Sequence, residues 1–186
     1  MSSHKTTTGK IPVSIKKLTF SGLAIALAML TSNIKIFTMP MGGAITLLSM
    51  FFICIIGYWF GLRYGLITAI AYGLLQFAID PYMLNIWQVL FDYPLAFGAL
   101  GLSGLFTNKK HGLQIGYITG TLGRLVFSTI SGVVFFASYA PKGMNPFVYS
   151  VAYQASYIIP EMVITLIIIS IPPVTKALNY VKSETI

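Results

Sequence analysis

Residues 84–106 read LNIWQVLFDYPLAFGALGLSGLF, a stretch in which Asp92 is the only charged residue. A run of about 20 mostly apolar residues is long enough for a helix to cross the hydrocarbon layer of a membrane. In lipid, every backbone polar group has to be bonded internally, so we expect such a run to be helical. The stretch therefore predicts a membrane-spanning helix that carries one buried carboxylate.

The rest of the chain has the same character. Its 186 residues are 56% hydrophobic and only 9% charged, whereas soluble domains carry roughly 25% charged residues. So few charges cannot cover a water-facing surface, which favours an integral membrane protein. The formal net charge is +8, but the basic residues lie between apolar runs instead of forming one basic face. We therefore expect no nucleic-acid partner.

Six apolar segments predict an all-α bundle of six transmembrane helices. We expect a polar tail at 1–16, a membrane domain at 17–178 and a second tail at 179–186. The second and third segments are short for a full crossing, and Arg63 divides them. The expected spans are 18–37, 45–60, 64–79, 84–106, 113–136 and 149–171.

The basic residues also predict an orientation. With the N-terminus in the cytoplasm, the outer loops hold only Lys35 and Lys142. Because Lys and Arg concentrate in cytoplasmic loops, we expect both termini to be cytoplasmic in a multi-pass protein of the cell membrane. The basic residues on the inner side are then Lys5, Lys10, Lys16, Lys17, Arg63, Lys109, Lys110, Lys176 and Lys182.

Ionisable groups inside a membrane are costly and often functional. Asp92 is expected about two turns below the outer end of its span. Tyr93 follows it, and Pro94 prevents a normal helical hydrogen bond there. A carboxylate walled by aromatic rings can receive an organic cation. The alternative is a carboxylate that caps loop backbone amides.

Arg124 and Glu161 lie in the fifth and sixth predicted spans, each about three turns from opposite ends. Antiparallel helices would bring both to mid-membrane, so we expect a structural ion pair. A role in ligand contact or in proton coupling is the alternative.

Other polar groups gather toward the predicted outer ends. Gln154 needs a partner in an apolar segment, and with Tyr149 it is a plausible recognition pair at the outer end. Gln76 and Asp80 close the third span, and Tyr82 follows. This grouping is typical of a pocket that captures a molecule arriving from outside.

Small residues recur at helical spacing, as in Gly116-xxx-Gly120 and Ala24-xxx-Ala28. Such stripes let helix backbones approach closely in lipid. Packing within one bundle explains the glycines. A docking face for a partner subunit is the sharper interpretation for Ala24 and Ala28.

Four segments now show a resemblance: GGAITL from Gly42, YGLLQ from Tyr72, FDYPLAFGALGLSGLF from Phe91 and SYAPKGMN from Ser138. They resemble the thiamine-specific substrate-binding subunits (S components) of energy-coupling factor transporters. The resemblance implies a six-helix bundle that captures thiamine outside the cell. It also implies docking on a transmembrane coupling subunit and two ATPase subunits. ATP would be used by those partners, with no cofactor in this chain.

The resemblance assigns roles to single residues. Asp92 falls where the family has an acidic residue for the cationic vitamin, and Ala24 with Ala28 match the docking motif of the first helix. Gln154 stands for a usual Asn and Ser128 for a usual His. The aromatic pocket positions are Tyr82, Tyr93 and Tyr149, with Phe37 and Phe136 where Trp commonly stacks on the ligand.

Three alternatives differ in class. The ligand could be a related thiazole or pyrimidine compound, or another vitamin. The chain could be an autonomous secondary carrier, although no repeated halves are visible. An intramembrane enzyme would need paired catalytic groups or metal ligands. His4 and His111 have no ligand partner at metal spacing, and the single Cys54 excludes a disulfide framework. We expect no catalytic and no metal site.

Overall fold

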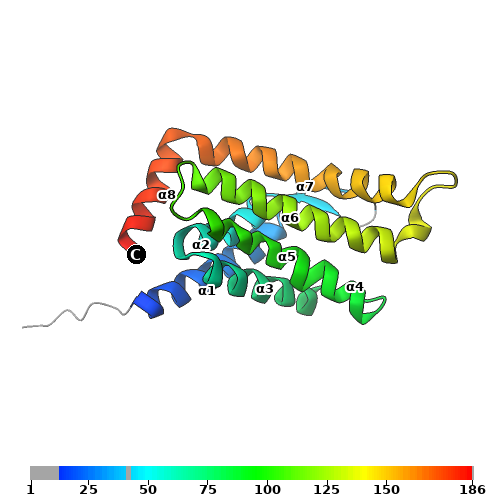
Figure 1. Ribbon diagram of the computed structural model, residues 1–186, viewed down its shortest axis with the longest axis horizontal. Coiled ribbons are helices and arrows are strands. Elements are labelled where there is room, and N and C mark those ends of the chain that lie inside the picture. The colour runs from blue at the N-terminus through cyan, green and yellow to red at the C-terminus, as the bar shows by residue number, and fades with distance from the viewer. Residues whose placement is uncertain (1–12, 41–42, 186) are drawn as a thin grey trace, which may run out of the picture.

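The computed structural model describes residues 13–40 and 43–185, which form an elongated helical bundle (Figure 1). Four long helices run along it: α1 (Val13–Ser32), α3 (Leu62–Ile79), α6 (Gly112–Phe135) and α7 (Pro146–Ser170). A fifth, composite helix covers Ile86–Phe106. Among the described residues, these five are long and apolar enough to cross a membrane. The prediction of a helical membrane bundle is therefore confirmed in outline.

Helix α2 (Ser49–Phe60) differs from the predicted span 45–60. It has 12 residues, which is about 18 Å at 1.5 Å per residue and shorter than the roughly 30 Å hydrocarbon layer. All of its residues are buried except the half-buried Phe52. Its apolar character comes from its position inside the bundle, because a helix that is hydrophobic all round is buried.

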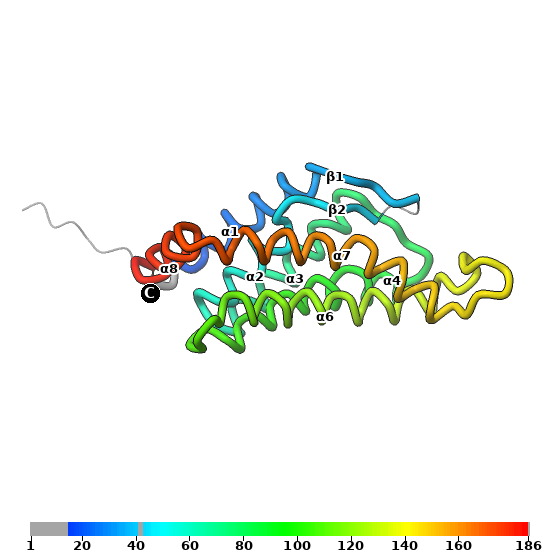
Figure 2. The backbone as a smooth tube through the Cα atoms, turned by 90° about the horizontal axis from the view of Figure 1, so that it is seen from above, coloured from blue at the N-terminus to red at the C-terminus, as the bar shows by residue number. Residues whose placement is uncertain are grey.

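A β-hairpin replaces the expected end of the first span, so the chain is not purely α-helical. Strands β1 (Lys35–Thr38) and β2 (Ala44–Thr46) pair antiparallel, with Phe37 opposite Ile45. The helix ends earlier because the side chains of Ser32 and Asn33 bond the carbonyl of Met29, at 2.8 and 2.7 Å. Figure 2 shows the hairpin running beside α7.

The composite helix changes its winding along its length. It consists of α4 (Ile86–Leu90), a π-helical turn η1 (Phe91–Leu95), α5 (Ala96–Gly98) and a 3₁₀ segment η2 (Ala99–Phe106). Pro94 lies inside the π-helical turn, where its missing N–H removes a regular helical bond. The predicted disruption at Pro94 is confirmed, and it falls on the turn that carries Asp92.

Glycines bring the backbones of α2, α3, η2 and α6 into contact. A Cβ atom added at Gly101 would lie 2.5 Å from the Leu66 nitrogen, and one at Gly104 would lie 2.4 Å from the Leu62 nitrogen. A Cβ at Gly116 would meet the Ser103 carbonyl at 2.8 Å. Such contacts exclude any side chain. The glycine stripes therefore serve packing within the bundle, as the sequence analysis expected.

An eighth helix, α8 (Pro172–Thr185), lies across the end of the bundle where α1 begins (Figure 1). The expected tail at 179–186 is therefore helical as far as Thr185. Tyr58 donates a hydrogen bond to Asn179 at 3.2 Å. The Lys182 ammonium lies 3.9 Å from the Tyr58 ring centroid and donates to the Thr107 carbonyl. Burial lowers the pKa of Lys182. The predicted tail at 1–16 lies outside the described residues up to residue 12, and α1 has begun by Val13.

Candidate functional site

Asp92 lies on the π-helical turn, at the end of the bundle opposite α8. Its Oδ2 accepts a hydrogen bond from Gln88 Nε2 at 2.6 Å. Gln88 is 1% exposed, and its own oxygen accepts from the Leu84 N–H at 3.0 Å. Within the described residues, neither a basic side chain nor a backbone N–H is bonded to this carboxylate. Asp92 therefore does not cap loop amides, and its charge has no cationic partner in the described chain.

Two tyrosines and a phenylalanine lie around this turn. The Tyr93 hydroxyl accepts from the Tyr82 N–H at 3.2 Å and donates to the Asp80 carbonyl at 3.3 Å. The Tyr82 ring stacks on Phe136, with ring centroids 6.0 Å apart and planes at 26°. A side-chain hydrogen bond with Tyr139 raises the pKa of Tyr82. These aromatic side chains thus connect the end of α3, the η1 turn and the end of α6.

A second aromatic row lies on α7. Tyr149 and Tyr153 stack with centroids 6.2 Å apart, and the Tyr157 hydroxyl donates to Gln154 Oε1. The amide oxygen of Gln154 thus has a partner in Tyr157, and the recognition role of Gln154 and Tyr149 stays a prediction. A Cβ atom added at Gly132 of α6 would lie 3.9 Å from Gln154 Nε2, so the α7 row packs against α6.

The β-hairpin contacts the row of tyrosines on α7. Tyr153 accepts a hydrogen bond from the Gly43 N–H at 2.9 Å. A Cβ atom at Gly43 would lie 2.6 Å from the Tyr157 ring, so only glycine fits there. Phe37, on β1, is 57% exposed and makes no ring contact with another described aromatic residue. The structure therefore does not place Phe37 in the aromatic group.

Residues that sequence reasoning missed complete the site. Gln88 stands one helical turn before Asp92, a spacing that puts both on one face and could have identified it. Ser131 lies beside the Asp92 carboxylate and is fully buried. Ser128, which was predicted, is also buried and lies three residues earlier on α6. The Ser131 hydroxyl of α6 therefore lies next to the carboxylate, and a ligand contact for Ser128 stays a prediction.

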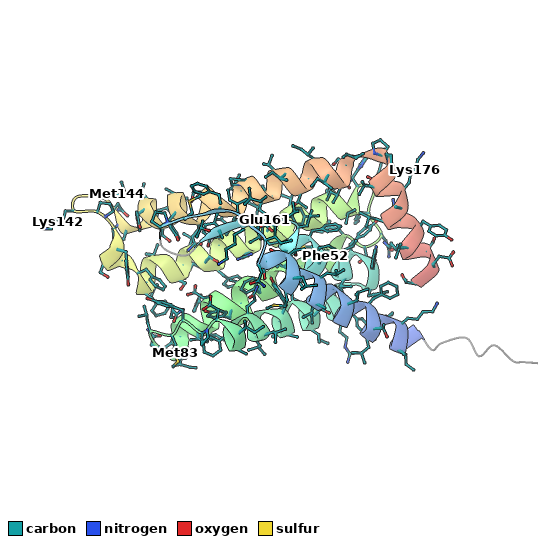
Figure 3. The ribbon with its side chains drawn as sticks, turned by 180° about the vertical axis from the view of Figure 1, so that it is seen from behind. Phe52, Met83, Lys142, Met144, Glu161 and Lys176 are labelled. Atoms are coloured by element: carbon teal, nitrogen blue, oxygen red, sulfur yellow. The ribbon has the colours of Figure 1, made fainter. Side chains whose placement is uncertain are left out.

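Glu161 is held by the start of α2 near the middle of the bundle (Figure 3). Its Oε2 accepts from the N–H and the hydroxyl of Thr46, at 3.1 and 2.7 Å. Its Oε1 accepts from the Ser49 hydroxyl at 3.0 Å and the Met50 N–H at 3.3 Å. The N-terminus of a helix favours negative charge. The carboxylate is therefore stabilised without any cation.

The predicted ion pair between Arg124 and Glu161 is consequently wrong. In the described part of the chain no salt bridge joins them. The Arg124 guanidinium instead lies 4.4 Å from the centroid of the Phe97 ring, a cation–π contact. The start of α2 therefore stabilises the Glu161 carboxylate, the role that the prediction gave to Arg124.

The structure does not place Ala24 and Ala28, the predicted docking residues, on an exposed face. These residues are 5% and 0% exposed and belong to the hydrophobic core of the chain itself. A docking surface has to be exposed. The small residues on the open side of α1 are Gly22 and Ala26, and a Cβ at Gly22 would meet no atom within 4 Å.

Comparisons with known proteins agree with this geometry. The family described as thiamine transporter protein (Thia_YuaJ) matches residues 18–180. The thiamine transporter ThiT of Bacillus subtilis is 35% identical over 146 residues, covering 71% of this chain and 76% of that protein. The ThiT of Lacticaseibacillus paracasei is 30% identical over 126 residues, covering 61% of each. A solved structure of ThiT from Listeria monocytogenes aligns with a TM-score of 0.74 over 86% of this chain and 94% of that chain. The two sequences are 24% identical, so this structural likeness supports the fold alone.

Proposed function

The chain belongs to the thiamine transporter protein family, and from this premise we propose that it captures thiamine as the substrate-binding subunit of an energy-coupling factor transporter. It is a multi-pass protein of the cell membrane and a transport protein, not an enzyme. The family match extends over nearly the whole chain, and its relatives are named thiamine transporters. A partner module with one coupling subunit and two ATPase subunits would supply the energy.

The observation that carries the proposal is the Asp92 carboxylate. It is half-buried beside aromatic rings and has no cationic partner among the described residues. Thiamine supplies a permanent positive charge on its thiazolium ring. A charge-assisted contact in a sheltered site is stronger than one in water. A cationic ligand would therefore satisfy a sheltered carboxylate that has no cationic partner among the described residues.

The rings around Asp92 suit the flat parts of the ligand. Carbon atoms pack best at about 3.5–4.0 Å, so a flat ring held between two others needs them about 7 Å apart. Tyr82 and Phe136 are 6.0 Å apart. Because these two rings already stack on each other in an offset contact, they would have to move apart to admit a ligand ring between them. Gln154 and Ser128 offer an amide and a hydroxyl for the aminopyrimidine and the hydroxyethyl arm.

Helix α1 is the most accessible surface for a coupling subunit. Only 17% of its spanning window is buried within the chain, the lowest share of the five candidate spans. Because Ala24 and Ala28 face inward, a partner would meet the side that carries Gly22 and Ala26. The basic end with α8 would then face the cytoplasm, in keeping with the distribution of Lys and Arg.

Titration of the purified chain with thiamine tests the proposal. Trp87 is 63% exposed and lies on α4 next to the Asp92 turn, so its fluorescence can report binding. We expect saturable binding of one thiamine per chain, and uptake into cells only when the coupling module is co-expressed. Absence of binding would overturn the proposal. Tighter binding of a thiazole or pyrimidine compound would change the substrate, and uptake by the chain alone would indicate a secondary carrier.

The docking side of α1 can be tested separately with Ala26→Trp. Ala26 is exposed, so the substitution should leave folding and thiamine binding intact while uptake falls to background. Ala71→Trp, at an exposed alanine of α3, is the matched control and should keep its uptake. Normal uptake by the Ala26→Trp variant would show that this side of α1 is not the docking face.

A further inference from the structure

A groove lies at the end of the bundle far from Asp92, where α6 begins and α7 turns into α8. Its volume is about 550 Å³, and Figure 3 shows Lys176 at this junction, at the opposite end from Lys142. The groove belongs to neither the thiamine site nor the open side of α1. It is lined by His111, Gln114, Ser170, Pro172, Thr175 and Lys176.

The lining has the chemistry of an anion site. Lys176 and His111 are exposed, and none of the lining residues is acidic. Lys109 and Lys110 precede His111 in the same exposed loop. Gln114 and Ser170 add an amide and a hydroxyl that can donate hydrogen bonds. Concentrated positive charge beside neutral donors attracts a phosphate group.

Three exposed isoleucines lie within three residues of the groove's lining residues, on α6 and at the end of α7, and we call them the isoleucine strip. Ile115 on α6 is 41% exposed, Ile167 on α7 is 63% exposed, and Ile171 at the end of α7 is 45% exposed. Ile115 and Ile171 directly follow the lining residues Gln114 and Ser170. A soluble anion gains nothing from such a strip, whereas an acyl chain does, at about 0.8 kcal/mol for each buried CH₂ group. The ligand that fits both parts is an amphiphile.

We propose that this groove binds an anionic phospholipid, with the phosphate against Lys176 and the acyl chains along the isoleucine strip. Gln114 and Ser170 donate to the phosphate or to the glycerol of the headgroup. Basic pockets between transmembrane helices bind acidic headgroups in this way. The lipid would hold α8 against α6 and α7, and the site is independent of thiamine binding.

Lipid binding can be measured by native mass spectrometry of the detergent-purified chain. The probes are dioleoylphosphatidylglycerol and dioleoylphosphatidylcholine at equal concentration. We expect phosphatidylglycerol to bind more tightly, and Lys176→Gln to weaken its binding about fivefold, the size expected for one lysine near a lipid surface. Lys176→Arg should keep the binding. Arg63→Gln removes the same charge from an exposed residue at the same end of the bundle, and it should have no effect.

Three results would overturn the proposal. Equal losses in Lys176→Gln and Arg63→Gln would show general attraction to a basic surface. Equal binding of both lipids would exclude recognition of the charge. Competition by glycerol phosphate at the lipid's own concentration would show that the strip contributes nothing. Thiamine titration of each variant confirms that it is folded.

Discussion

Replacing Asp92 by asparagine is expected to weaken thiamine binding by well over tenfold while the bundle stays folded. Asparagine keeps the size of the side chain, and its oxygen can still accept the hydrogen bond from Gln88. The negative charge is lost. Truncating one partner of a sheltered charge pair costs about 2–5 kcal/mol, and each 1.4 kcal/mol is about tenfold in affinity. The electrostatic contact should therefore dominate the change.

The control for this variant is Asp80→Asn. Asp80 lies at the end of α3, at the same end of the bundle, and it is exposed. The same loss of charge there should change the affinity less than about twofold, because exposed charges contribute little. A second arm uses a thiamine analogue with a neutral ring in place of the thiazolium. If Asp92→Asn weakened both ligands equally, the role of Asp92 would be structural and not electrostatic.

Glu161→Gln is expected to lower the midpoint of thermal unfolding by about 5–10 °C. The carboxylate accepts four hydrogen bonds, two on each oxygen. Glutamine presents an NH₂ group in place of one oxygen. The hydroxyl on that side can turn to accept from it, but the backbone N–H would face another donor. Each buried donor left unsatisfied costs about 1–3 kcal/mol. In a chain of this size, 1 kcal/mol corresponds to roughly 2–4 °C.

Glu184→Gln provides the matched comparison, because it makes the same change at an exposed residue of α8. Its unfolding midpoint should match that of the unmodified chain. Unfolding can be followed by the intrinsic fluorescence of the detergent-solubilised protein. An unchanged midpoint in Glu161→Gln would mean that the start of α2 does not depend on this carboxylate.

The long apolar runs predicted most of the fold. The spans expected at 64–79 and 113–136 correspond to Leu62–Ile79 and Gly112–Phe135. The sequence could not identify α2 as a short internal helix, because hydropathy does not distinguish burial in protein from burial in lipid. The hairpin was missed for a related reason: its residues continue the apolar run of α1.

The site was predictable from the sequence where a single residue determines the local structure or chemistry, as at Pro94 and Asp92. Glu161 shows what the sequence could not predict. The charged residues alone suggest that a cation pairs with Glu161, and they do not reveal the backbone N–H groups at the start of a helix. The docking face of α1 shows a second limit of the sequence. Gly22-xxx-Ala26 and Ala24-xxx-Ala28 differ by two residues, or about 200° around a helix with 3.6 residues per turn. Spacing alone cannot decide which pair faces outward.

The glycine contacts among α2, α3, η2 and α6 divide the bundle into a stiff part and a yielding part. Touching backbones have no side chains that can rotate aside, so a passage between these helices would require whole helices to separate. The hairpin meets α7 through hydrogen bonds to side chains, from the Gly43 N–H to the Tyr153 hydroxyl and from Thr46 to the Glu161 carboxylate. The glycines therefore form a fixed wall of the bundle, and a change of shape that admits a ligand would fall on the hairpin side, where side chains and not touching backbones make the contact with α7.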